Sequence, residues 1–185
     1  MSRVELFGPA HKALRYAGTR VLVELGKCVG QLGEVARALA ATRELFELQA
    51  IHQRVEDTIV IPAIEARRPG ASVRLADAHA DHGEVIASLR TRLMEIEERG
   101  ASPEAMHALY LEVSRFIADN FLHMYEEETL AGPLLEEIYS QAELATMLAR
   151  IPTVLSQAER DAFLASMLPA LSHAERSHFA PAGSS

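Results

Sequence analysis

The sequence is poor in aromatic residues and in cysteine. It has no Trp, its aromatic residues make up 5% of 185 positions, and Cys28 is its single cysteine. One cysteine excludes an intrachain disulfide and a zinc site built from several cysteines. We expect Cys28 to be a buried structural residue, with pairing between two chains as the alternative. The length suits one domain with a small appendix.

Basic charge and long apolar runs are also scarce. The chain has 26 acidic residues against 18 Lys and Arg, which gives a formal net charge of -8. This balance disfavours a nucleic-acid binder or a polybasic membrane-surface protein, because both need a basic face. The sequence lacks the ~18 consecutive apolar residues of a membrane span. Its first residues, Met1–Glu5, lack the apolar run of a signal peptide, so we expect a cytoplasmic protein.

The hydrophobic pattern is helical throughout, and a period of two is never sustained. Ser102-Pro103-Glu104 is a strong helix start, and Gly26 begins a glycine-rich loop. Four long amphipathic helices with short connections predict an all-α, antiparallel up-down four-helix bundle. The predicted helices cover about 9–28, 34–67, 72–99 and 103–133, and Ser72 is the expected cap of the third.

The segment after Ser140 has shorter helical patterns. Ser156 with Glu159, and Ser172 with Glu175, have the spacing of capping boxes. We therefore divide the chain into a bundle, residues 1–139, and a C-terminal helical appendix with its tail, residues 140–185. The appendix helices at about 141–179 are expected to pack on the bundle or to form a homodimer, and residues 181–185 to fray.

Two segments combine histidine, glutamate and proline at the same spacing. His52 and Glu56 precede Pro62, and His123 and Glu127 precede Pro133. Residues four apart are neighbours on one helical face, so each pair can offer an imidazole nitrogen and a carboxylate to one cation. This donor pair suits iron, manganese or zinc. The His-to-Glu spacing alone is a weak signal in a chain with eight histidines.

An internal repeat strengthens the signal. Adding 71 to positions 11, 52, 56 and 62 gives positions 82, 123, 127 and 133, with the same residue type at each match. The chain thus reads as two helix pairs, each with one His on its first helix and His-xxx-Glu on its second. Folded face to face, they would aim His11, His52, His82, His123 and both glutamates at one point, as dinuclear centres in bundles do.

Several neighbouring residues have open roles. A single His in an apolar stripe is more often a core residue, but two buried Glu without partners would carry a large desolvation cost. His79 could be a further ligand or an outer-shell partner of His82, although the repeat places Gly8 at its counterpart. Asp57 is expected to be solvated or outer-shell, and the inner stripe is expected to include Leu130. Glu126 is expected to be a solvated or outer-shell acid. Tyr125 could donate a hydrogen bond near the centre, but its expected role is packing. The histidines outside the repeat are expected at the surface, namely His107, His173 and His178.

These motifs resemble the hemerythrin-like proteins with an HHE cation-binding domain, over roughly residues 9–137. The resemblance implies a non-haem diiron centre in a four-helix bundle. It implies terminal histidine ligands and bridging carboxylates, namely His11, His52, His82 and His123 with Glu56 and Glu127. Oxygen-carrying members have a further His and an Asp where this chain has Ile86 and Glu128. The missing imidazole argues against simple reversible oxygen carriage and favours open coordination positions.

Three functions are compatible with such a site. The first is a diiron protein, with manganese or zinc as other metals, that binds or reacts with dioxygen, nitric oxide or peroxide. The second is an iron- or redox-responsive interaction module without turnover, in which residues 141–179 report the metal state to a partner. The third is catalytic: an oxidase or peroxidase-like activity, or nitric-oxide scavenging and repair of damaged iron centres. The sequence has no substrate-pocket motif, so whether it is an enzyme stays open.

Overall fold

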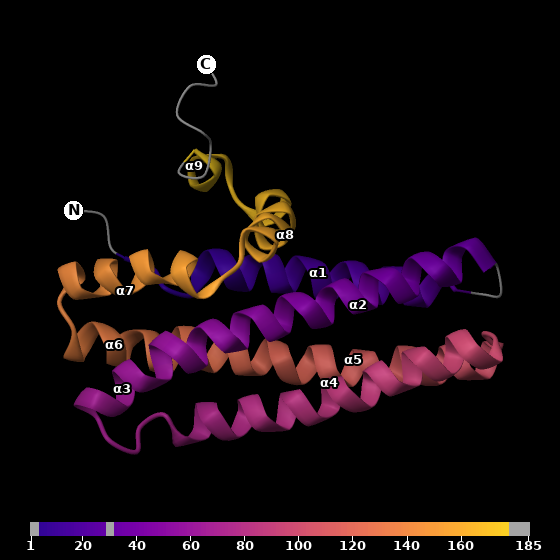
Figure 1. Cartoon of the computed structure of the whole chain (residues 1–185), viewed down its shortest axis with the longest axis horizontal. Helices are drawn as coiled ribbons and strands as arrows, with labels where there is room; N and C mark the ends of the chain where they lie inside the picture. Colours follow the sequence, from indigo (N-terminus) through magenta and orange to yellow (C-terminus); the bar gives the residue numbers. More distant parts are fainter. Residues whose placement is uncertain (1–3, 29–31, 178–185) are drawn as a thin grey trace.

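The computed structural model describes residues 4–28 and 32–177, and within these residues every regular element is a helix. This confirms the all-helical prediction. Four long helices lie side by side along the long axis of the molecule (Figure 1). Contacts join the first to the second, the third to the fourth, the first to the fourth and the second to the third. The four are α1 (Gly8–Lys27), α2 (Leu32–Val55), α4 (Val73–Arg99) and α5 (Pro103–Glu126).

Two of these long helices do not end in a loop but pass into a short π-helical turn. The π-turn η1 (Glu56–Val60) leads into α3 (Ile61–Arg67), and η2 (Glu127–Ala131) leads into α6 (Gly132–Ile138). In η1 the N–H that follows the turn donates to the carbonyl oxygen of Glu56, and in η2 it donates to that of Glu127. The sequence predicted unbroken α-helices over 34–67 and 103–133, so the π-turns are a correction.

The prolines explain the π-turns. Pro62 and Pro133 lack an N–H, and in an α-helix the proline ring would clash with the carbonyl four residues earlier. The wider π-turn accommodates one extra residue and shifts the phase of the buried stripe. Leu130 is consequently 60% exposed, whereas Ala131 and Leu135 are buried. The expectation that Leu130 continues the inner stripe is therefore wrong.

Three predicted boundaries of the long helices, at Ser102, Gly26 and Ser72, have different outcomes. The hydroxyl of Ser102 accepts the N–H of Ala105, which confirms this residue as the cap of α5. Gly26 belongs to α1 and not to a loop. Ser72 precedes α4 without capping it, because its hydroxyl donates to Glu65 at 2.6 Å.

Two further expectations from the sequence concern the burial of Cys28 and the lack of a membrane span. Cys28 is half-buried rather than buried, and its thiol contacts the carbonyl oxygen of Glu24 at 3.4 Å. Within 4–28 and 32–177, no helix combines the length and hydropathy that a membrane crossing needs.

Apolar side chains form two main clusters along the long axis. The larger lies between the four long helices and includes Phe46, Leu93 and Phe116. The second lies around the π-turns and includes Phe7 and Ile64. Buried polar side chains occur where the two clusters meet, so the core has a polar layer with apolar packing on both sides.

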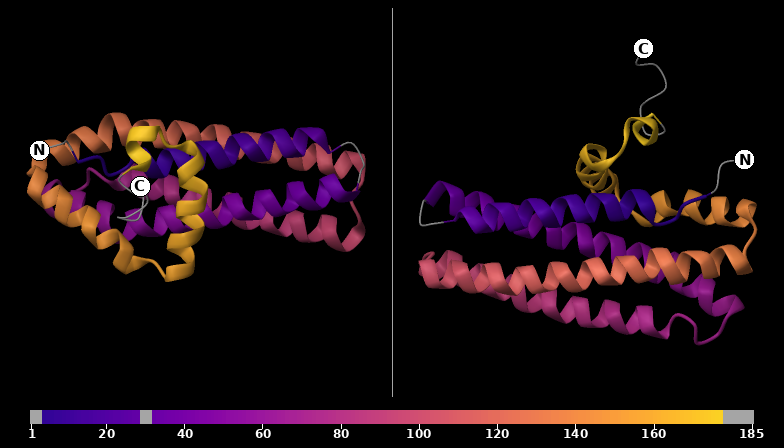
Figure 2. Two further views of the ribbon diagram at one scale, coloured as in Figure 1. Left: turned by 90° about the horizontal axis from the view of Figure 1, so that it is seen from above. Right: turned by 180° about the vertical axis from the view of Figure 1, so that it is seen from behind.

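The C-terminal helices pack against this structure. They are α7 (Gln141–Val154), α8 (Gln157–Met167), the 3₁₀ turn η3 (Leu168–Ala170) and α9 (His173–Arg176). α7 contacts η1 and α6, while α8 crosses over α1 and α2 (Figure 2). Both predicted capping boxes are present, and a third, which sequence analysis missed, begins α7: Ser140 with Glu143, Ser156 with Glu159, and Ser172 with Glu175. The predicted frayed tail, 181–185, lies outside the described residues.

We expect the appendix to share stability with the long helices, because Leu144 of α7 is 1% exposed and belongs to the second apolar cluster. Leu144→Ala should lower the free energy of unfolding by about 2–5 kcal/mol, since it leaves a cavity in that cluster. The matched control is Leu148→Ala on the same helix, where the side chain is 41% exposed. Urea unfolding followed by circular dichroism measures both, and equal destabilisation by the two variants would contradict the shared core.

Candidate metal centre

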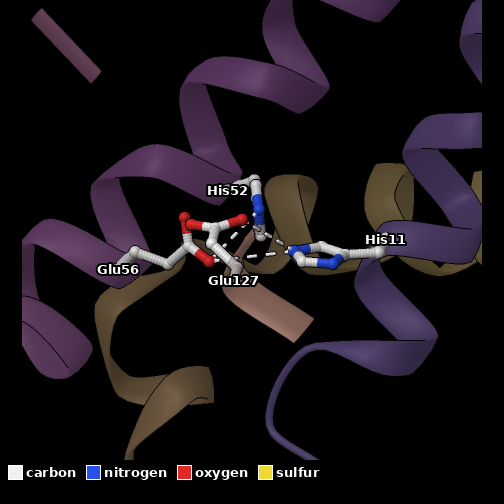
Figure 3. Close-up of side chains that lie close together, drawn as sticks. All are labelled: His11, His52, Glu56 and Glu127. Carbon is white, nitrogen blue, oxygen red and sulfur yellow. Dashed lines mark ion pairs between the residues drawn. The ribbon is translucent and has the colours of Figure 1, made fainter. Parts of the chain in front are cut away.

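Four buried side chains from four elements converge in the polar layer of the core. They are His11 of α1, His52 of α2, Glu56 at the start of η1 and Glu127 at the start of η2 (Figure 3). Each offers one donor atom, and these atoms lie within 4.8 Å of one another. His11 Nε2 is 3.2 Å from Glu127 Oε2, and His52 Nε2 is 3.3 Å from Glu56 Oε1. This group can hold a metal ion.

A second group shares both carboxylates with the first. It adds His79 of α4 and His123 of α5 to Glu56 and Glu127, again with donor atoms within 4.8 Å. His79 Nε2 is 3.3 Å from Glu56 Oε2, and His123 Nε2 is 3.1 Å from Glu127 Oε1. The two imidazole rings in each group are equally far apart. The ring centroids of His11 and His52 are 5.0 Å apart, and so are those of His79 and His123.

His82 lies beside these groups but belongs to neither. It is 8% exposed, its ring meets that of His123 at 5.1 Å edge to face, and its Nδ1 has no hydrogen-bond partner. The 71-residue repeat pairs His11 with His82. In the structure, however, it is His79 that contacts the shared glutamates in the second group as His11 does in the first. The three-residue difference is close to one helical turn, so both histidines share a buried face of α4.

The residue after each shared glutamate orients a histidine of the other helix pair. Glu128 Oε1 accepts from His11 Nδ1 at 2.7 Å, and Asp57 Oδ1 accepts from His79 Nδ1 at 2.7 Å. Such carboxylate partners fix the ring and the tautomer, so that Nε2 faces the metal. Arg15 in turn donates to Glu128 at 2.6 Å. The sequence left Asp57 as a solvated or outer-shell residue. In the structure its carboxylate contacts His79 and orients that ring.

Other acidic and aromatic neighbours have no such contact. Glu126 pairs with Arg74 at the surface, and the side chain of Tyr125 is 61% exposed, which contradicts its expected packing role. His107 and His173 are exposed, as predicted, and His178 lies outside the described residues.

Charge pairing dominates the electrostatics of the metal-free site. Burial lowers the pKa of His11, but the facing carboxylates of Glu127 and Glu56 outweigh it and raise this pKa to about 9. Burial likewise opposes protonation of His79, yet the same carboxylates and Asp57 raise its pKa to about 10. Burial alone would raise the pKa of Glu127, but the surrounding imidazoles hold it well below the usual range.

The buried atoms of the first group lack ordinary partners. Five of them have no hydrogen bond, and they face the same space: His11 Nε2, His52 Nε2, both carboxylate oxygens of Glu56, and Glu127 Oε2. In the metal-free protein, ion-pair contacts of 3.2 Å between His11 Nε2 and Glu127 Oε2 and of 3.3 Å between His52 Nε2 and Glu56 Oε1 offset part of their burial cost. A cation in this space would satisfy all of them. Imidazole nitrogens with carboxylate oxygens fit iron, manganese or zinc.

The fold and this donor set define a helical protein that can bind a cation between its long helices. The family described as hemerythrin HHE cation binding domain matches residues 4–135. The chain therefore belongs to this family, which confirms the resemblance seen in its motifs. No curated protein and no solved structure gives a significant match.

The carboxylates of Asp57 and Glu128, which contact His79 and His11, lead to one prediction. Asp57→Asn and Glu128→Gln should each lower the affinity for metal about 10- to 100-fold, because the histidine loses its negatively charged acceptor. Asp77→Asn, an exposed residue of α4, is the matched control. Titration with Zn²⁺ against a competing chelator measures the affinities. Unchanged affinity in both variants would contradict the positioning role of these carboxylates.

The raised pKa values generate a second prediction. Protonated His11 and His79 must lose their protons before their Nε2 atoms can bind a cation, so binding at neutral pH should release about two protons per chain. Apparent affinity should therefore rise with pH until the pKa values of about 9 and 10 are reached. Calorimetry with Zn²⁺ in two buffers of different ionisation enthalpy counts the protons. Binding without proton release would show that these imidazoles are neutral in the metal-free protein.

Proposed function

We propose that the chain is a non-haem diiron protein of the hemerythrin type, in which residues 1–139 form an antiparallel up-down four-helix bundle. The observation that carries this proposal is the pair of histidine groups that share Glu56 and Glu127. A single cation would need one such group, whereas two groups with both carboxylates in common suit two ions with bridging carboxylates. Manganese or zinc could occupy the same donors.

The proposed ligand roles follow from these contacts. His11 and His52 would bind one ion, His79 and His123 the other, and the two glutamates would bridge them. His82 stays a candidate ligand of the second ion, because its ring lies against that of His123. The two carboxylates would also offset part of the positive charge that the ions bring into the core.

An iron pair held by these residues would supply redox-active sites for a small ligand such as dioxygen, nitric oxide or peroxide. The side chains of this protein would exclude water from those sites and orient the histidine ligands. The apolar clusters on either side keep the polar layer away from water. Glu128 and Asp57 hold the Nδ1 protons of His11 and His79, which directs their Nε2 atoms toward the shared glutamates. A cytoplasmic location and a homodimer stay predictions.

Replacement of individual ligands tests the proposal. The native protein should contain about two irons per chain, as carboxylate-bridged centres in helix bundles do. His52→Ala and Glu127→Ala should each lower the iron content and the charge-transfer absorption, while His107→Ala, at an exposed position, should change neither. Elemental analysis and absorption spectra with and without oxygen measure these effects. Full iron occupancy in both variants would refute the ligand assignment, and zinc alone in the native protein would refute the diiron proposal.

A further inference from the structure

The outward face of α5, the side turned away from the core, carries an exposed apolar stripe that continues into η2. Four large apolar side chains on it are each more than half exposed: Leu111, Leu122, Tyr125 and Leu130. Helical residues advance by about 100° each, so the three in α5 fall within about 60° of one another. The exposed Ala118 lies between them. We call these five residues the α5 stripe.

Exposed apolar residues on the other long helices are more scattered. On α4, Val73, Val85 and Met94 are twelve and nine residues apart, which places them on three different sides of the helix. Single exposed apolar residues are normal, whereas a contiguous stripe marks an interaction surface. The appendix leaves the α5 stripe open to solvent, because α8 crosses over α1 and α2 (Figure 2).

The charges beside the stripe favour a second copy of this chain as its partner. Arg115 and Asp119 flank Ala118, and their side chains are 88% and 57% exposed. Their contact within one chain measures 3.8 Å. In an antiparallel pair of copies, the arginine of each copy approaches the aspartate of the other, whereas a parallel pair would oppose like charges. This charge pattern is therefore complementary to itself about a two-fold axis.

The same axis suits the apolar residues of the stripe. With Ala118 on the axis, positions equally far before and after it meet, so Leu111 of one copy would lie opposite Tyr125 of the other. Asp119 of one copy would lie opposite residue 117 of the other, about 3 Å of helical rise from Arg115 and within reach of its long side chain. A small residue at the crossing point allows the two helices to approach closely.

The overall charge of the chain opposes this association, but the charges along the stripe do not. Two copies with a net charge of -8 each repel one another, although salt screens that repulsion beyond about 10 Å. Close to the stripe the acids are neutralised, because Glu112 pairs with Arg92 at 3.2 Å and Glu126 pairs with Arg74. One helix face is smaller than the interface of an obligate dimer, about 2,000 Å² or more, so we expect a reversible association.

We propose that the α5 stripe is a homodimer interface, in which two copies of the chain pack α5 against α5, antiparallel, about a two-fold axis at Ala118. The C-terminal appendix, the segment for which the sequence left dimer contacts open, packs on the long helices of its own chain. The proposed interface lies on the outer surface of α5. It is therefore independent of which metal, if any, the core holds.

Analytical ultracentrifugation of the full-length protein over a range of concentrations tests the interface. The native protein should dimerise reversibly, both metal-free and with Zn²⁺. Leu122→Asp should weaken the dimer about 30-fold or more, as the loss of a central contact does. Leu148→Asp, at an exposed position of α7, should leave it unchanged, and circular dichroism confirms that both variants are folded. A native protein that stays monomeric at hundreds of micromolar overturns the proposal, and so does a dimer that Leu122→Asp does not weaken.

Charge reversal tests the antiparallel arrangement. Arg115→Asp and Asp119→Arg should each weaken the dimer about tenfold, because two ion pairs across the axis are lost and like charges face each other. The double variant R115D/D119R restores opposite charges across the same axis, so its dimerisation should return to near the native strength. General damage to the helix would not be repaired in this way. A double variant as monomeric as the single ones overturns the two-fold arrangement.

Discussion

The structure depends on one electrostatic constraint, the burial of Glu56 and Glu127 among imidazole rings. Isolated buried carboxylates are very costly, so they persist only with nearby positive charge or a cation. Each carboxylate touches histidines from both helix pairs: His11 of the first pair lies 3.2 Å from Glu127, and His79 of the second lies 3.3 Å from Glu56. The polar layer therefore links the two pairs, and their packing and the chemistry of the site have the same cause.

The backbone around each carboxylate is adapted to this layer. Both glutamates begin a π-turn, and a proline six residues later makes a regular α-helix unfavourable there. Because π-turns are rare and concentrate at functional sites, their occurrence at two repeat-matched positions connects backbone geometry with the site. The phase shift brings Ala131 and Leu135 into the core and turns Leu130 outward. Apolar packing thus continues beyond the carboxylates into the second apolar cluster.

Sequence reasoning recovered the helices and the two His-xxx-Glu pairs, because both depend on local spacing along one helix. The α-helical period of apolar residues continues through Pro62 and Pro133, so spacing alone does not predict the π-turns. The contact role of His79 was also left open, because the repeat compares positions at one constant offset. The two helix pairs differ by three residues in the spacing of their histidines, so a constant offset selects His82 instead of His79. The partners of Asp57 and Glu128 depend on contacts between pairs, which sequence spacing does not specify.

The two histidine groups are related by the internal repeat, but their surroundings differ. The group of His79 and His123 has the ring of His82 nearby, and the group of His11 and His52 lies next to an apolar pocket bordered by the appendix. An added imidazole on one side and an apolar space on the other make the surroundings of the two groups unequal. Because Ile151, Leu155 and Phe163 border this pocket, the appendix that packs across α1 and α2 also adds apolar contacts on the side of His52.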